Sequence, residues 1–168
     1  WVKTSSTDSQ RILSKDDGGS ERSYFLMQLD TARGYRFGVF NGGSETQVTS
    51  GGDTAYSDGL WHHVVGTYTP GVSMEIYVDG VLQATNTSSI PASIDADTAD
   101  LEIGRMQTPS TYWNGDIFDV RLVQYAMCAE EVAALYGGWA DPAALGWWLG
   151  IGESKVVQAT DSTTIQDM

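Results

Sequence analysis

The stretch from residue 60 to residue 86 contains the pattern that most restricts the fold of this chain. Between residues 72 and 79 apolar and polar side chains alternate without a break, which is typical of a half-buried β-strand. Asp79-Gly80 then supplies the positive φ angles of a tight turn, and an extended pattern resumes over residues 81–85. Thr69-Pro70-Gly71 closes the other end. The segment is therefore predicted to form a three-stranded antiparallel meander.

Short extended runs separated by turns continue along most of the chain. The segments "NGGSE" and "TSGGD" are typical turn sequences, and the chain contains 19 glycines. Many short strands at regular spacing favour an all-β, two-sheet antiparallel sandwich. The further runs predicted as strands are residues 11–14, 24–29, 35–40, 101–104 and 117–125.

One segment has a helical pattern instead. In "MCAEEVAALY", residues 127–136, the apolar side chains recur on one helical face, and Glu130 and Glu131 suit the positive end of a helix dipole. A single short helix is therefore predicted over residues 129–136.

The charge balance excludes two classes of partner. Lys and Arg together number 9 against 22 Asp and Glu, so the formal net charge is -13. A field of this sign repels phosphate backbones and anionic lipids, and the sequence contains no run of Lys and Arg that would reverse it locally. No apolar run approaches the roughly 20 residues that cross a bilayer. The chain is therefore expected to bind no nucleic acid and to insert into no membrane.

Several motifs in series resemble one known family. "WVKT" at 1–4, "LWHHVVGTY" at 60–68, "EIYVDGVL" at 75–82, "LEIGR" at 101–105 and "WNGDIFDVRLVQYAMCAEEVAALY" at 113–136 stand in the order found in laminin-G-like domains. These domains belong to the concanavalin A-like lectin and glucanase superfamily. The resemblance covers nearly all of residues 1–137 and implies a jelly roll of two antiparallel sheets packed face to face.

The adjacent histidines His62 and His63 allow two interpretations. With Glu75 and Asp79 they could form a metal or acid–base site, or they could be packed strand residues. A metal site needs further convergent ligands, and no spacing in the sequence identifies them. The resemblance implies that the two histidines are structural, and the strand pattern places Glu75 and Asp79 toward solvent.

The superfamily includes polysaccharide-cleaving enzymes, so a catalytic function has to be considered. Retaining glycosidases place two carboxyl groups about 5 Å apart. Glu75 and Asp79 are four residues apart, which is about 13 Å along a strand. Asp116 and Asp119 would point to opposite faces of a regular strand. We therefore expect no catalytic residues. The one cysteine, Cys128, stands where the family has a serine that caps the helix.

A binding site is predicted at "TYWNGD", residues 111–116. Tyr112 and Trp113 offer aromatic faces for a sugar ring, and Asn114 and Asp116 offer polar groups for its hydroxyls. The alternative is that the tryptophan packs into the core, as it does in relatives. The resemblance also implies a possible structural calcium ion, since acidic residues are abundant. Its ligands remain unknown, because Phe118 stands where relatives commonly have a second acidic residue.

The ends of the chain carry a separate prediction. The resemblance places Trp1 in the middle of a family strand, so a laminin-G-like jelly roll over residues 1–137 would lack its first strands. Residues 138–144 are predicted to be a linker. Residues 145–168 resemble the start of a second such domain, with a strand at 146–151 that belongs to a tandem repeat, a permuted domain or a swapped strand. The alternative is a linker throughout.

Two function classes follow from these expectations. The first is a non-catalytic binding or adhesion module for a carbohydrate or glycoprotein on an extracellular or surface protein. The second is a structural component of a large assembly, such as a phage or viral particle, whose partners are neighbouring copies. The sequence does not identify the ligand.

Overall fold

The computed structural model describes residues 1–30, 34–51, 56–107 and 111–138. The predicted linker at 138–144 lies almost wholly, and the predicted strand at 146–151 wholly, outside these residues. The elements, in chain order, are β1 (Val2–Lys3), β2 (Gln10–Asp16), β3 (Arg22–Gln28), β4 (Tyr35–Asn41), β5 (Ser44–Thr49), β6 (Trp61–His62), β7 (Val64–Thr69), β8 (Ser73–Val78), β9 (Val81–Asn86), β10 (Leu101–Ile103), β11 (Arg105–Met106), β12 (Thr111–Tyr112), β13 (Asp116–Ile117) and α1 (Ala129–Gly137).

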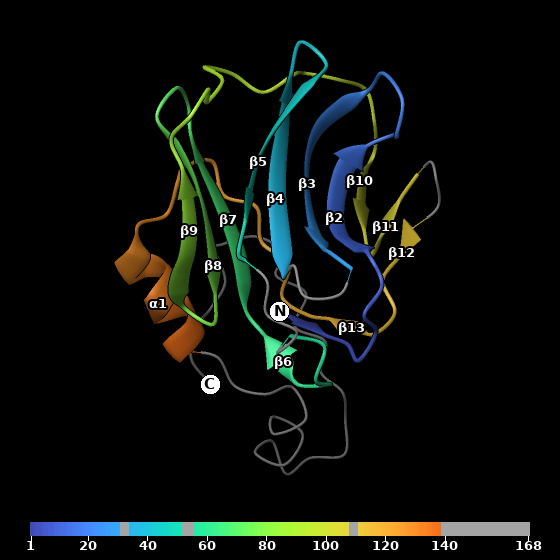
Figure 1. The fold of residues 1–168 in the computed structure, drawn as a ribbon, viewed down its shortest axis with the longest axis vertical. Helices are drawn as coiled ribbons and strands as arrows, with labels where there is room; N and C mark the ends of the chain where they lie inside the picture. The colour runs from blue at the N-terminus through green and yellow to red at the C-terminus, as the bar shows by residue number, and fades with distance from the viewer. Residues whose placement is uncertain (31–33, 52–55, 108–110, 139–168) are drawn as a thin grey trace, which may run out of the picture. The chain divides into compact units, whose positions relative to one another are not determined.

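Two antiparallel sheets dominate the described part of the chain. The larger sheet has the strand order β10-β2-β3-β4-β5, and the smaller has the order β7-β8-β9. A short three-stranded sheet, β13-β1-β6, and the two-stranded pair β11-β12 complete the strand arrangement of the described residues. Figure 1 shows α1 beside β9, at the edge of the smaller sheet. The predicted all-β class with one short helix is confirmed.

The core lies between the two main sheets. Tyr35, Val39 and Val48 from the larger sheet cluster with Met74 and Ile76 from the smaller one. The alternating pattern of β8 predicted one buried face, and the structure confirms it, because Met74, Ile76 and Val78 are at most 2% exposed. The strand β7 approaches β4 closely at Gly66, where an added Cβ would overlap the ring of Phe37.

The predicted meander and its tight turn are present. β7, β8 and β9 pair antiparallel in sequence order. The turn between β8 and β9 has φ angles of 52° at Asp79 and 77° at Gly80, so both central residues occupy the left-handed region that a type I′ turn needs. The predicted strands at 11–14, 24–29, 35–40 and 101–104 correspond to β2, β3, β4 and β10.

Two predictions about strands were wrong. The strand β5 was not predicted, because its sequence "SETQVT" is polar and only Val48 is buried. The predicted strand at 117–125 ends almost at once, since β13 stops at Ile117 and residues 118–128 contain no strand. Phe118 still exchanges two backbone hydrogen bonds of 2.9 Å with Trp1. Asp119 then adopts a φ of 51°, which breaks the extended backbone.

The helix forms where the sequence predicts it. Cys128 occupies the N-cap position, and its backbone N–H donates to the carboxylate of Glu131 at 2.9 Å. That bond is one half of a capping box. Val132 is fully buried, so this side chain anchors the helix. No helix in the described residues is long and apolar enough to span a bilayer.

Candidate binding site

The predicted binding turn lies between β12 and β13. Tyr112 ends β12 and leaves 60% of its surface exposed. Trp113 is half-buried against the hydrophobic core. Its backbone N–H donates to Gly104 O at 2.8 Å, and its indole Nε1 donates to Asp116 O at 3.2 Å. Trp113 therefore fixes the turn to the sandwich, whereas the ring of Tyr112 is available to a ligand.

The two polar residues of the turn are bonded to residues near the start of the chain, in β1, just after β1 and in β2. The backbone N–H of Asn114 donates to Gln10 Oε1 at 2.7 Å, and its carbonyl accepts from Thr4 Oγ1 at 2.5 Å. Because its backbone makes both bonds, the exposed side chain of Asn114 is left toward solvent. Asp116 forms an exposed ion pair with Lys3, with 3.1 Å between Nζ and Oδ2. The turn thus presents Tyr112, Asn114 and Asp116 on a tethered backbone.

His62 belongs to a polar network rather than to an open site. Its ring nitrogens lie 2.8 Å from Asp79 Oδ2 and 3.2 Å from Asp58 Oδ1. Burial lowers the pKa of His62, but the hydrogen bonds and charges of Asp79 and Asp58 outweigh this effect, so the net pKa is raised. Asp79 therefore turns back onto His62 and does not face solvent as the strand pattern predicted.

His63 has an aromatic environment. Its ring centroid lies 4.8 Å from that of Trp1 and 6.2 Å from that of Tyr136. Burial lowers the pKa of His63 to about 4, so the ring is neutral at pH 7. In the described residues no group of three or more His, Cys, Asp or Glu side chains is arranged to hold a metal ion. The surroundings of both histidines thus agree with the structural interpretation.

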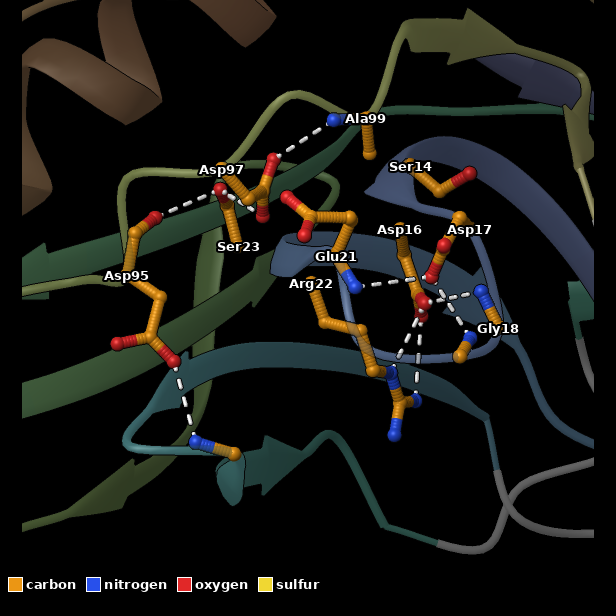
Figure 2. Close-up of polar contacts among 12 residues, drawn as sticks. Ser14, Asp16, Asp17, Gly18, Glu21, Arg22, Ser23, Asp95, Asp97 and Ala99 are labelled. Carbon is orange, nitrogen blue, oxygen red and sulfur yellow. Dashed lines mark hydrogen bonds and ion pairs between the residues drawn. The ribbon is translucent and has the colours of Figure 1, made fainter.

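Acidic side chains gather at the loops that follow β2 and precede β10, and Figure 2 shows their contacts. Asp97 Oδ1 lies 2.8 Å from Lys15 Nζ, and Asp97 Oδ2 accepts from Ser23 Oγ at 2.6 Å. Asp95 accepts from the backbone of the β4–β5 turn through Gly42 N at 2.9 Å. These carboxylates already have cationic or N–H partners, so they do not fit a calcium site. Calcium remains a prediction with no site among the described residues.

A cluster of arginines packed on phenylalanines was not predicted from the sequence. It lies on the face of the larger sheet that is turned away from the core, and we call it the arginine face. It consists of Arg11 on β2, Arg22 and Phe25 on β3, and Arg36 and Phe40 on β4. The sequence shows no basic cluster here, because these arginines are 11 and 14 residues apart in the chain. Antiparallel pairing of β2, β3 and β4 is what brings them together.

The comparisons with known proteins give one family and a set of solved structures. The family model Laminin_G_3, described as the concanavalin A-like lectin/glucanases superfamily, matches residues 1–133. A search of the curated proteins finds no match.

The chain is similar to solved structures of bacterial proteins. The chain is 12% identical to the binding domain of Paraclostridial Mosquitocidal Protein 1, over 80% of this chain and 34% of that one, with a TM-score of 0.53. It is also 12% identical to the receptor binding domain of botulinum neurotoxin mosaic serotype C/D, over 82% and 34%, with a TM-score of 0.51. An S-layer domain-containing protein from Clostridium thermocellum is 26% identical over 81% and 66%, with a TM-score of 0.41. The chain thus spans about a third of each toxin structure and about two thirds of the solved part of the S-layer domain-containing protein.

Proposed function

The chain belongs to the concanavalin A-like lectin/glucanase superfamily, and from this premise we propose that it is a non-catalytic module that binds a carbohydrate or a glycoprotein outside the cell or at its surface. The observation that carries the proposal is the turn at Tyr112. An aromatic ring that is 60% exposed stands beside polar side chains on a backbone held by hydrogen bonds. An aromatic face with nearby polar groups is the arrangement that suits a sugar ring. A tethered turn also loses little conformational entropy on binding.

The two toxin structures are those of a binding domain and of a receptor binding domain. Their identity of 12% to this chain bears on the fold only. They therefore agree with a binding function on this fold without identifying a ligand. We propose a glycan or glycoprotein as the partner because of the chemistry of the turn.

The absence of catalysis is part of the proposal and has its own support. The carboxylate of Glu75 accepts a hydrogen bond from Tyr77 Oη at 2.5 Å, and Asp79 binds His62. Asp116 is paired with Lys3, and Asp119 with Arg121 at 2.7 Å. Each of these four carboxylates therefore has a partner in its own chain. Release of reducing sugar from a panel of β-glucans tests this part, and turnover that disappears in Glu75→Gln would contradict it.

A glycan array probed with the full chain tests the binding function. The decisive variant is Tyr112→Ala, and its matched control is Tyr125→Ala, because Tyr125 is a similarly exposed tyrosine at 58%. Loss of one stacked aromatic ring is expected to weaken binding by about 2-fold to 10-fold. The control should bind as the unmodified chain does. An array without any bound glycan, or equal loss in both variants, would refute the proposal.

The second candidate function is a structural unit of a larger assembly. It is favoured by a run of exposed apolar side chains after β13, which in an assembly could be covered by a neighbouring copy. The comparisons lend no support to a virion as the site of that assembly. A mass measurement of the native particle separates this function from the first. The exposed side chains of the run are Phe118, Val120, Leu122, Val123 and Tyr125.

A further inference from the structure

The strand registers set out the arginine face as rows of side chains. Arg11 pairs with Met27, and Met27 pairs with Arg36, so these three side chains form one row across β2, β3 and β4. Directly paired residues lie on the same face of a sheet. The next row contains Phe25 opposite Gly38, where an added Cβ would overlap the phenylalanine ring. Phe25 therefore lies flat across β4, beside the row that holds two arginines.

The arginines cover the two phenylalanines. The Cζ atom of Arg11 lies 4.1 Å from the ring centroid of Phe25, and that of Arg22 lies 3.9 Å from the ring centroid of Phe40. Phe25 is 1% exposed and Phe40 is fully buried, although they lie on the outer side of the sheet. Stacked guanidinium groups thus remove the aromatic surface from water.

This structural role leaves some hydrogen-bonding groups unsatisfied. Asp16, whose side chain is fully buried, binds Arg22 through contacts of 2.9 and 3.2 Å, and Figure 2 shows this pair. The same carboxylate lies 3.5 Å from Nη2 of Arg11. Nη1 of Arg11 and Nε of Arg36 are buried without any hydrogen-bond partner. The Arg11 side chain is only 10% exposed, so water does not make up this loss.

The charges of the face are also incompletely balanced. Burial lowers the pKa of Arg11, and the neighbouring charges of Arg22 and Arg36 lower it further, while Asp16 and Glu45 oppose this shift. Arg36 forms no ion pair with any described residue. In a chain with 22 acidic and 9 basic side chains, three arginines therefore share one buried carboxylate and the exposed Glu45. An anion bound at the half-buried Arg36 would relieve the repulsion among these arginines.

We propose that the arginine face binds the acidic group of a saccharide through Arg36, which is half-buried, while the buried Arg11 adds positive charge beneath it. A guanidinium group presents parallel N–H donors that match the oxygens of a carboxylate or a sulfate ester. Gln47 and Thr49 on β5 pair with Gly38 and Arg36, so their side chains lie on the same face and can meet sugar hydroxyl groups. The inference rests on the proposed carbohydrate-binding function and names its ligand class: a uronic acid or a sulfated sugar.

Calorimetric titration of the full chain with three oligosaccharides of equal length tests this inference. The probes are an oligogalacturonate, which carries carboxylates, a heparin-derived oligosaccharide, which carries sulfates, and a neutral dextran oligosaccharide. At least one acidic probe is expected to bind about tenfold more tightly than the dextran oligosaccharide. Added salt should lower the affinity for that acidic probe. The acidic probe that binds identifies the group that the arginines recognise.

The decisive variant is Arg36→Gln, which removes the charge of an arginine that forms no ion pair with the described residues. This change should lower the affinity for the acidic probe by about tenfold or more. Arg121→Gln is the control, because Arg121 is exposed, is paired with Asp119 and is not one of the residues of the arginine face. If Arg36→Gln does not fold, Arg36→Lys keeps the charge without the planar fork and should show a smaller loss.

The outcomes separate this inference from the proposed function. If acidic probes bind no more tightly than dextran, or if Arg36→Gln and Arg121→Gln lose equal affinity, the arginine face is only structural. Binding of a neutral glycan that depends on Tyr112 would then still support the proposed function. Conversely, the acidic probe could lose affinity for Arg36→Gln but not for Tyr112→Ala. That result would support binding at the arginine face independently of the turn.

Discussion

At the scale of single residues, Gly38 shows how closely the outer face of the larger sheet is packed. Its neighbour Phe25 occupies the space that a side chain at this position would need. Gly38→Ala should therefore lower the free energy of unfolding by about 1 to 3 kcal/mol through overpacking. Gly137→Ala is the control, because outside its own helix no atom of the described residues lies within 4 Å of its added Cβ. In the helix this change should stabilise the protein by about 0.5 to 1 kcal/mol. Urea unfolding measures both effects, and equal changes would contradict the packing argument.

The pKa of His63 predicts a dependence of stability on pH. Burial lowers this pKa from 6.5 to about 4, so between these values the unfolded chain binds a proton that the folded chain does not. The contribution of His63 to stability is therefore complete above pH 6.5 and is lost as the pH falls toward 4. His62, whose pKa is raised, contributes in the opposite sense, since its stabilisation is present below its unfolded pKa and is lost as the pH rises.

Replacing His63 by phenylalanine should remove the acid-side loss and keep the stack with Trp1 and Tyr136. On going from about pH 7 to about pH 5, the Tm of His63→Phe is expected to fall less than that of the unmodified chain. Thermal melts followed by circular dichroism at the two pH values give the comparison. Parallel decreases in both proteins would show that His63 does not carry this pH dependence.

At the scale of elements, the start of α1 offers a test of capping. Cys128 holds the N-cap position, where a hydroxyl group accepts a hydrogen bond from a first-turn N–H better than a thiol does. Cys128→Ser should raise the free energy of unfolding by up to about 1 kcal/mol. Cys128→Ala is the control and should give no such gain. If serine and alanine give the same midpoint in urea, the N-cap side chain has no measurable effect.

At the scale of the whole molecule, the sequence-based prediction that residues 146–151 add a strand to a jelly-roll sheet stays a prediction. It is tested by comparing the full chain with a chain that ends at residue 144. The exposed apolar side chains between Phe118 and Tyr125 are the surface that such a strand would cover. Without residues 145–168 the protein should self-associate and melt at a lower temperature, as measured by light scattering and calorimetry. A monomeric truncated chain with an unchanged Tm would make residues 145–168 only a linker.

The sequence by itself determined the secondary-structure elements that depend on residues close together in the chain. The alternation at Met74, Ile76 and Val78 specifies a buried strand face, and Asp79-Gly80 specifies its turn through backbone angles that few residue pairs adopt. The family motifs extended this local information to the fold class. Strand β5 was missed because its sequence is polar and lacks a strand pattern. It is extended because it pairs with β4.

Only the tertiary structure decided which polar residues meet. Simple alternation would place Arg11 and Leu13 on one face of β2, but a β-bulge at Ile12 sends Leu13 toward Leu26 and leaves Arg11 beside Met27. The register of β3 and β4 then adds Arg36 to the same row. Likewise His62 meets Asp79 from another strand end. Such contacts depend on pairing between distant segments, and a one-residue shift in register moves each side chain to the opposite face of the sheet.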